Sequence, residues 1–558
     1  MTRVGLVAIV ALAAGLRLWG IDHGLPFLMG RPDEAEALRH TGGFPAGRLD
    51  PGWFVYPNLF FWVVWLWDEA ILALVRLGTP LASYAELVRT DDLAPLILAG
   101  RVLAALAGTL TVLVTGLVGR RLGGPALGLT SAVLLAVCFL HVRDSHALKA
   151  DVFLTAGMVP CLWLLARWVA APRAATAGLA GVAVGVTMGM KYPAVLLMAS
   201  AWHASWMVRA GAGWRRLLPH RHMVAVGVVA ALVFFAASPF FFLDTEQLRS
   251  TVDLVLRATY AERPGQASEA AAGWGERLAT FLGARTFGYH LLVSLRHGLG
   301  LPLALVAPLA IGAAAWRERE PFFRLAALFC VVYYVAIGLG QATLARYLTP
   351  LTPLLCLLAA RLLTRVAGLV PPSRLRWAAL AVATAVLAAP TLHSAVAYDR
   401  IAARADTRVL AYDWMRGELP AGAVVAVLGS IFFPIADPTL PPQVRRADLK
   451  LAEKNLDQHG VTHVVTHDHP LPWSSPLPGQ LAAQGDRLEP LVTFTPFAGA
   501  PTGGFEEHDA HFIPFFDFDG VVRPGPIVRV YRLRPPRRVA TPPAASSEGA
   551  DPMIASER

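Results

Sequence analysis

Long apolar segments recur along the chain from its start to about residue 392. A helix needs about 20 mostly apolar residues to cross the hydrocarbon core of a bilayer. Eleven windows reach or approach this length, and we predict a membrane-spanning helix in each of them: 4–20, 96–118, 124–141, 152–170, 175–190, 193–208, 223–243, 298–316, 322–340, 347–368 and 376–392. The first window also has the character of a signal peptide, with Ala11-Leu12-Ala13 near a cleavage site, but the further spans favour an uncleaved helix.

One apolar segment does not follow this pattern. Residues 56–78, YPNLFFWVVWLWDEAILALVRLG, are rich in Trp but carry Asp68 and Glu69 in the middle. Trp and Tyr prefer the interface between membrane and water. We therefore predict helices that lie at the outer interface, inside a long outer loop formed by residues 21–95.

Basic residues alternate with the predicted spans. They gather in five loops: Arg120-Arg121, Arg167 with Arg173, residues 209–221, Arg317 with Arg319, and residues 361–376. Cytoplasmic loops of membrane proteins carry an excess of Lys and Arg. All five loops are cytoplasmic if the N-terminus is cytoplasmic and the eleven spans alternate, which places everything after residue 393 on the outer side.

The pattern changes in this last part of the chain, where short helical and strand patterns alternate. We expect helices over 407–419 and 443–460, and strands over 423–430, 461–468, 491–497 and 527–533. This alternation predicts a small α/β domain with a partly parallel sheet. A further outer loop, 244–297, is polar and partly helical in character.

The predicted fold class is therefore mainly α. Residues 1–398 form a polytopic helical membrane bundle of about 11 spans with interfacial helices, and residues 399–534 form an outer α/β domain. Residues 535–558, rich in Pro, Ala and Ser, are expected to be a disordered tail.

Composition agrees with a membrane protein. Of the 558 residues 55% are hydrophobic and only 16% are charged, against about 25% charged in soluble domains. The net charge of +10 is explained by Arg in cytoplasmic loops, and no basic stripe with interleaved aromatic residues indicates a nucleic-acid partner. The four cysteines all fall in apolar segments, where buried thiols pack as small hydrophobic groups.

Some charged residues do not follow the positive-inside rule in the predicted topology. They lie at or near the predicted outer ends of spans. The four cations are Arg143, Lys149, Lys191 and Arg346, and the nearby carboxylates are Asp33, Glu34, Glu36 and Asp151. Snorkelling explains any one cation alone. Four cations near carboxylates instead indicate a polar pocket at the outer face, and Arg and Lys bind phosphate oxygens strongly.

Asp33 also has a purely structural explanation. The spacing of Asp33 and Glu36 matches a helix capping box with Asp33 at the N-cap. A capped helix can still direct a carboxylate at a substrate, so both interpretations stay open.

The outer domain contains a second cluster of polar side chains. Histidine and aspartate side chains in this cluster are possible zinc ligands. However, no tight spacing of two ligands plus two is present, and loop histidines are commonly solvated. The residues are His467, Asp468, His469, His508, Asp509, His511, Asp517 and Asp519.

Several short motifs, in this order, resemble the GT-C superfamily, and more narrowly bacterial members of glycosyltransferase family 39, related to protein O-mannosyltransferases and aminoarabinose transferases. They are the Asp33-Glu34 loop, Tyr56-Pro57, HVRDSHALKADVFLT (141–155), GVTMGMKYPAVLL (185–197), ARYLTPLTPLL (345–355) and PGPIVRVYRL (524–533). Family members often have two prolines in the juxtamembrane segment, where this chain has only Pro57.

The resemblance implies a bacterial inner-membrane enzyme with a periplasmic C-terminal domain. Such enzymes move a sugar from a polyprenyl-phosphate carrier to the hydroxyl of a glycan, lipid or protein by inverting transfer. The implied roles are a general base for Asp33 with Glu34 beside it, and donor-phosphate binding for Arg346 and Lys191, then Arg143 and Lys149. Acceptor or metal positioning falls to Asp151, Glu36, Tyr56, Tyr192 and Tyr347, with a divalent metal ion as an open cofactor.

Two other classes of protein remain as alternatives. A transporter of an anionic or lipid-linked substrate would place charges in mid-span and often carries an inverted repeat, and neither is visible here. A membrane-anchored sensor with an outer ligand-binding domain would leave Asp33 without a role.

Overall fold

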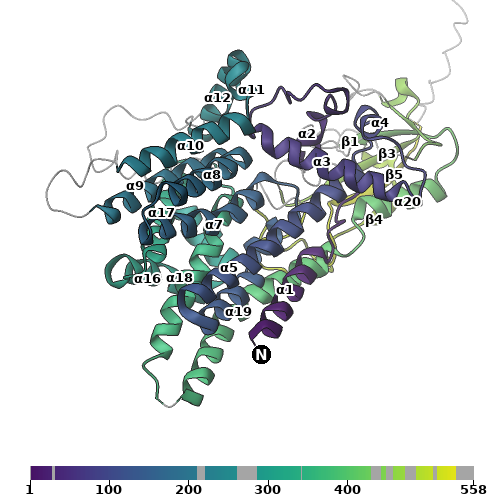
Figure 1. Ribbon diagram of the computed structural model, residues 1–558. Coiled ribbons are helices and arrows are strands. Elements are labelled where there is room, and N and C mark those ends of the chain that lie inside the picture. Colours follow the sequence, from purple (N-terminus) through teal and green to yellow (C-terminus); the bar gives the residue numbers. More distant parts are fainter. Residues whose placement is uncertain are drawn as a thin grey trace, which may run out of the picture.

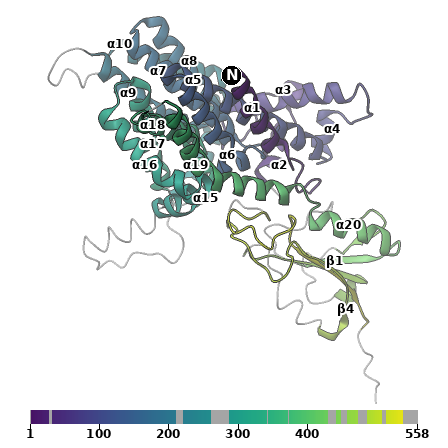
Figure 2. The same cartoon turned by 90° about the horizontal axis from the view of Figure 1, so that it is seen from below.

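The computed structural model describes residues 2–27, 32–209, 220–260, 286–340, 342–371, 373–428, 441–447, 456–471, 485–506 and 512–535. Within these residues a large bundle of helices lies beside a small sheet (Figures 1 and 2). The predicted disordered tail falls, apart from residue 535, outside the described residues, as does part of the loop 244–297.

Each of the eleven predicted windows lies largely in helix, although short breaks interrupt 124–141, 223–243 and 298–316. The helices are α1 (Thr2–Leu18), α5 (Ala94–Ala136), α7 (Ala150–Ala170), α8 (Ala174–Met190), α9 (Leu197–Val208), α10 (Arg221–Ala237), α16 (Leu301–Arg317), α17 (Pro321–Gly338), α18 (Thr352–Ala367) and α19 (Ser373–Ala402). Helix α5 contains two windows, joined across a kink where Gly124 has φ +80° and Pro125 follows. A left-handed φ of this kind favours glycine.

Length and composition alone qualify six of the described helices as membrane spans, or seven if a bent pair is counted as one span. The pair consists of segments Phe287–Leu299 and Leu301–Arg317, which meet at 116°. Helix α3 (Asn58–Val75) is among the six, and its Asp68 is fully buried. The predicted helix is therefore confirmed, whereas its placement at the outer interface stays a prediction.

Glycines bring α8 and α10 close together. A Cβ atom at Gly181 would lie 2.8 Å from the Val226 carbonyl oxygen, and one at Gly185 would lie 2.6 Å from that of Ala230. Small residues four apart allow helix backbones to approach in this way. The contact fixes the C-terminal end of α8, which is where Lys191 follows.

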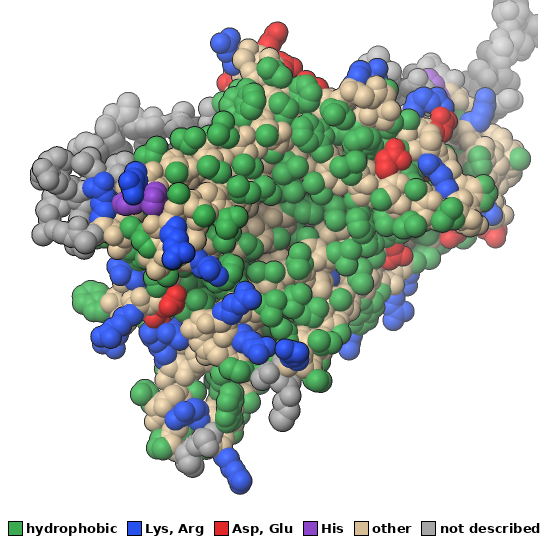
Figure 3. All heavy atoms as spheres, viewed as in Figure 1, with side chains coloured by type: hydrophobic (Ala, Val, Ile, Leu, Met, Phe, Trp, Pro, Cys, Tyr) green, Lys and Arg blue, Asp and Glu red, His purple; other side chains and the backbone are tan. Residues whose placement is uncertain are grey.

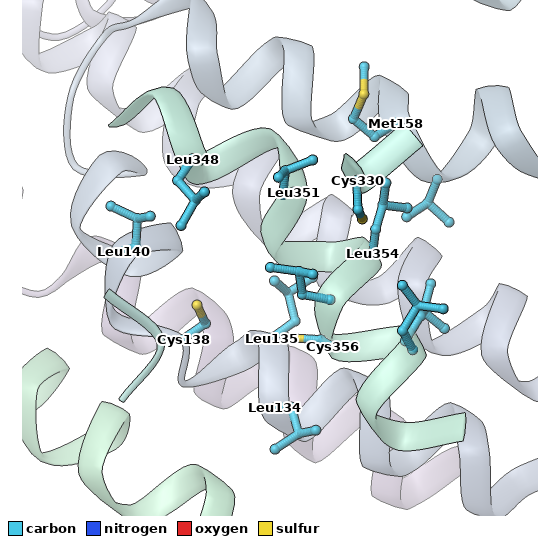
Figure 4. Packing of buried hydrophobic residues seen from close by; sticks show 14 of the residues in the cluster. Leu134, Leu135, Cys138, Leu140, Met158, Cys330, Leu348, Leu351, Leu354 and Cys356 are labelled. Carbon is cyan, nitrogen blue, oxygen red and sulfur yellow. The ribbon is translucent and has the colours of Figure 1, made fainter. Parts of the chain in front are cut away.

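The core of the bundle forms where the segment 345–367 packs against α5, α7 and α17. Figure 4 shows Leu351, Leu354 and Cys356 of this segment facing Leu135 and Cys330. All four cysteines are free and buried, as the sequence predicts.

The remaining elements of the bundle are mostly short. They are α2 (Pro32–Arg39), η2 (Phe44–Ala46), α4 (Tyr84–Arg89), α6 (Phe139–Asp144), η3 (Tyr192–Leu196), α11 (Phe240–Leu243), α12 (Thr245–Tyr260), α14 (Phe287–Tyr289), η5 (His290–Leu295), α15 (Arg296–Leu299) and η6 (Ala345–Leu351). Helix α2 begins at Pro32, so Asp33 lies in its first turn rather than at the N-cap. The capping-box interpretation is wrong because proline occupies the first helical position, which suits it.

The C-terminal part of the chain, predicted to lie on the outer side and called the outer domain below, has a five-stranded sheet of order β2-β1-β3-β5-β4. Its elements are α20 (Thr407–Glu418), β1 (Val424–Leu428), β2 (Arg445–Arg446), η8 (Leu456–His459), β3 (His463–Asp468), η10 (Gly485–Arg487), β4 (Leu488–Phe494) and β5 (Ile527–Leu533). β2, β1 and β3 run parallel, and β5 is antiparallel to β3 and β4, so the partly parallel sheet is confirmed.

One predicted helix of this domain, 443–460, is wrong in its first part. Arg445 and Arg446 form an edge strand, in which the Arg445 amide donates to the Ala423 carbonyl at 2.8 Å. Pairing with β1 replaces the helical turn here, because a nearby strand edge offers partners that local sequence does not reveal. Residues 448–455 lie outside the described residues.

The described residues 496–506 and 512–522, called the strand-free segment below, contain no regular strand and lie between the sheet and the helices (Figure 2). The Phe139 ring lies 5.4 Å from that of Phe515 and 5.7 Å from that of Phe518, between ring centroids. His297 stacks on Phe516 at 4.3 Å. This segment belongs to the same hydrophobic core as the bundle, so the outer domain is packed onto the membrane helices.

The surface of the bundle is apolar over a wide area. In Figure 3 hydrophobic side chains cover the middle of the visible face, while Lys and Arg gather toward the ends of α9, α16 and α18. An apolar surface of this extent is expected where lipid replaces water as the solvent.

Candidate active site

Four segments distant in sequence bring their charged side chains to one place. Asp33 comes from the first turn of α2, and Lys149 and Asp151 flank the start of α7. Lys191 follows the last residue of α8, and Arg346 is the second residue of η6. The predicted convergence of outer-end charges is therefore observed for these five residues.

Asp33 is the accessible carboxylate of the cluster. Its Oδ2 atom lies 3.1 Å from an Arg346 guanidinium nitrogen and 3.5 Å from Lys149 Nζ, and its side chain is 35% exposed. Two cations beside one carboxylate oxygen create a strong electrostatic field, and a ligand can reach it because Asp33 is partly exposed. An anionic ligand can therefore bind these cations beside Asp33 or in its place.

Asp151 forms the buried half of the cluster. Its Oδ1 atom accepts a hydrogen bond from Lys191 Nζ at 2.5 Å, and its Oδ2 atom lies 3.9 Å from Arg346 Nε. The side chain is only 1% exposed. Because Asp151 contacts both cations, it fixes the position of Lys191 and of the inner side of the Arg346 guanidinium.

Two tyrosine rings line the cations. Lys191 Nζ lies 5.5 Å from the centroid of the Tyr347 ring and 6.0 Å from that of Tyr56, within range of cation–π attraction. Burial, followed by the charge of Asp33, raises the pKa of Tyr56 well above its ordinary value. Its hydroxyl therefore stays protonated and can act as a hydrogen-bond donor.

Glu34, predicted as a second catalytic carboxylate, faces away from this cluster. It is 1% exposed and accepts hydrogen bonds from the Arg101 guanidinium at 2.7 and 2.9 Å. It also accepts from the Leu148 amide at 2.7 Å, next to Lys149. These contacts indicate that Glu34 positions the loop that carries Lys149. Its partner Arg101 lies within an apolar window, and the sequence analysis did not single it out.

Three other predicted site residues have their contacts elsewhere. Glu36 is 47% exposed and pairs with Arg39 and His40 on the surface of α2. The Tyr192 hydroxyl donates to the Phe54 carbonyl at 2.8 Å. Arg143, only 1% exposed, lies 3.5 Å from Asp144 and 3.4 Å from Glu506 of the outer domain. We therefore leave these three out of the site.

The histidines and aspartates that left zinc open as a ligand are described only in part, and the described part of the chain contains no group of three or more His, Cys, Asp or Glu side chains that could hold a metal ion. His508, Asp509 and His511 lie outside the described residues. In the charged cluster Asp33 and Asp151 each already face cations, and the three cations outnumber the two carboxylates, so the cluster suits an anion better than a metal ion.

A family model described as dolichyl-phosphate-mannose-protein mannosyltransferase matches residues 95–240. This stretch runs from α5 to α10 and carries Lys149, Asp151 and Lys191. No match is found among the curated proteins.

Solved structures resemble the chain over most of its length. ArnT from Cupriavidus metallidurans bound to undecaprenyl phosphate is 17% identical with a TM-score of 0.51, covering 94% of this chain and 97% of ArnT. Its apo state is 15% identical with a TM-score of 0.50, covering 88% and 97%. The oligosaccharyltransferase AglB from Archaeoglobus fulgidus, in complex with an inhibitory peptide and a dolichol-phosphate, is 13% identical with a TM-score of 0.49, covering 89% and 73%.

At these identities the ArnT structures establish the fold, including the helical membrane bundle followed by a small sheet. The family match adds a sequence relationship over the segment that carries Lys149, Asp151 and Lys191, three of the five residues of the charged cluster. Residues 95–240 thus resemble the dolichyl-phosphate-mannose-protein mannosyltransferases, and the chain shares the fold of ArnT.

Proposed function

We propose that the chain is an inverting glycosyltransferase that moves a sugar from a polyprenyl-phosphate carrier to an acceptor hydroxyl. The acceptor is a glycan, lipid or protein at the outer face of a bacterial inner membrane, with the N-terminus cytoplasmic and the outer domain periplasmic. The observation that carries this proposal is the accessible Asp33 carboxylate held between Arg346 and Lys149.

In this proposal Arg346 and Lys149 bind the phosphate of the donor. Charge-assisted hydrogen bonds from Arg and Lys to phosphate oxygens are short and strong. The fold shared with ArnT bound to undecaprenyl phosphate supports a lipid phosphate as the ligand. Lys191, held by Asp151, adds a third positive charge on the inner side.

Donor binding changes the partners of Asp33. In the structure the Asp33 carboxylate pairs with both Arg346 and Lys149. When the phosphate takes over these cations, Asp33 is released to accept a hydrogen bond from the incoming hydroxyl. The exchange places the base beside the sugar only when the donor is present.

The transfer itself is a single displacement. The acceptor oxygen bonds to the anomeric carbon while the bond from that carbon to the phosphate oxygen breaks, and the acceptor proton passes to Asp33. A general base of this kind contributes about 10²- to 10⁴-fold. The polyprenyl phosphate leaves with an added negative charge, which Arg346 and Lys149 stabilise in the transition state. One displacement inverts the anomeric centre, so no second carboxylate is needed as a nucleophile.

The test uses the purified chain in nanodiscs together with the total polyprenyl-phosphate sugar fraction and the glycan, lipid and protein acceptors extracted from host membranes. Mass spectrometry follows the loss of each lipid-linked sugar and the gain of free polyprenyl phosphate. We expect turnover by the wild type and at least a 100-fold slower turnover by Asp33→Asn. Turnover by Asp33→Asn at the wild-type rate would refute the role of Asp33, and no consumption of any lipid-linked sugar by the wild type would refute the function.

A further inference from the structure

Glu506 is a buried carboxylate of the outer domain that reaches the membrane bundle. It lies in the strand-free segment, and its side chain is 3% exposed. Its Oε1 atom accepts hydrogen bonds from the Ala345 amide, at 2.7 Å, and from the Tyr289 hydroxyl. Its Oε2 atom lies 3.4 Å from an Arg143 guanidinium nitrogen.

The amide that Glu506 binds is the first of η6, directly before Arg346. The first amides of a helix have no partner within it and carry partial positive charge, so a carboxylate there is stabilising. No side chain of the preceding residue, Leu344, caps this helix. Glu506, which is 161 residues away in sequence, provides the hydrogen bond instead.

Residues of α6 also contact η6. Arg143 bridges Glu506 and Asp144, and the Thr349 hydroxyl of η6 donates to Asp144. The Arg143 guanidinium also lies 4.9 Å from the centroid of the Phe515 ring of the outer domain. Glu506, Arg143 and Asp144 thus form one buried network that contacts η6 at Ala345, its first residue, and at Thr349.

We infer that Glu506 is a positioning residue for the donor site: the outer domain sets the position of Arg346 through the hydrogen bond between Glu506 and Ala345. This inference rests on the proposed function of Arg346 in binding the donor phosphate. It assigns the outer domain a direct part in donor binding.

The test is a double-mutant cycle on the affinity for undecaprenyl phosphate, measured by microscale thermophoresis on the full chain in detergent. Hydrogen bonds to charged groups contribute about 1.5–3 kcal/mol, so Glu506→Ala is expected to weaken binding by about ten- to a hundredfold. In an Arg346→Ala background, Glu506→Ala should change the affinity less than twofold, because residues that act through one another are not additive. A merely structural role would weaken binding equally in both backgrounds.

Two further variants guard against an effect of misfolding. Glu506→Gln keeps an oxygen for the Ala345 amide but loses the charge opposite Arg143, so it should weaken binding less than Glu506→Ala. The control is Glu489→Ala in the same domain, where Glu489 pairs only with arginines at the surface in the contacts described. Its affinity should equal that of the wild type.

The outcomes separate the inference from the function. Wild-type affinity in Glu506→Ala, together with weaker binding in Arg346→Ala, would overturn the inference and leave the donor site intact. Wild-type affinity in Arg346→Ala would overturn the donor site itself, and with it the inference.

Discussion

Replacing Glu34 by alanine tests whether this residue holds the site together or takes part in the chemistry. The carboxylate is 1% exposed, and its loss leaves the buried Arg101 guanidinium without its ion-pair partner. Breaking a buried ion pair by removing one partner costs about 3–5 kcal/mol. The Leu148 amide, which donates to Glu34 at 2.7 Å, also loses its acceptor.

We expect the midpoint of thermal unfolding of Glu34→Ala in detergent to fall by on the order of 5 °C. Donor affinity should fall with it, because the loop before Lys149 loses its anchor. The matched control is Glu36→Ala, two positions along the same helix, where the carboxylate is 47% exposed. Surface pairs of this kind contribute about 0–1 kcal/mol, so the control should unfold with the wild type.

The double variant Glu34→Met/Arg101→Met is a second test of the buried ion pair. It removes both charges, and replacing a buried pair by apolar side chains is often neutral or stabilising. It should therefore be more stable than Glu34→Ala. The structural role of Glu34 would be refuted if Glu34→Ala unfolded at the wild-type temperature while transfer was abolished, since Glu34 would then act in catalysis.

Three more predictions concern the charged cluster and the outer domain. Asp33→Asn should bind undecaprenyl phosphate at least as tightly as the wild type, because the phosphate no longer competes with a carboxylate for Arg346; weaker binding in a titration would contradict the proposed exchange. Lys149→Met should weaken that binding by about tenfold or more, the loss of one charge-assisted hydrogen bond, and an unchanged affinity would exclude Lys149 from the donor site. Burial lowers the pKa of His469 to about 3, so the unfolded chain takes up a proton as pH falls below about 6.5 while the folded chain does not. The outer domain should therefore lose on the order of 2 kcal/mol between pH 7 and pH 4.5, and limited proteolysis should show a smaller pH effect in His469→Phe; an identical pH dependence would contradict the assignment to His469.

The membrane helices could be predicted from the sequence because lipid imposes a simple length rule. All eleven apolar windows are largely helical. The kinked α5 shows the limit of that rule, since two windows form one helix broken only at Gly123–Gly124. In the outer domain the same kind of local pattern was wrong at Arg445, because an edge strand is formed by pairing with a neighbour distant in sequence.

The site could be predicted only in part. Charges at the outer ends of spans identified Asp33, Asp151, Lys191 and Arg346, because cations there are costly without an anion. Adjacent helix residues point about 100° apart, so Asp33 and Glu34 could not both face the same pocket. Arg101 decides which of these two residues faces the charged cluster, because it binds Glu34 from a position 67 residues away in sequence.

Glu506 could not be found from the sequence at all. Its partner Ala345 contributes only a backbone amide, and no residue type marks that amide as the start of η6. The contact exists because the strand-free segment packs Phe515 against Phe139 of the bundle. Tertiary packing of this kind leaves no periodic or compositional signal.

The most direct test of the proposed donor site is an electron cryo-microscopy structure of the chain with undecaprenyl phosphate bound. We expect the phosphate within hydrogen-bond distance of Arg346 and Lys149, with the Asp33 carboxylate moved away from both cations toward the exposed side of the cluster. A lipid phosphate bound away from these cations, with the contacts of Asp33 unchanged, would contradict it.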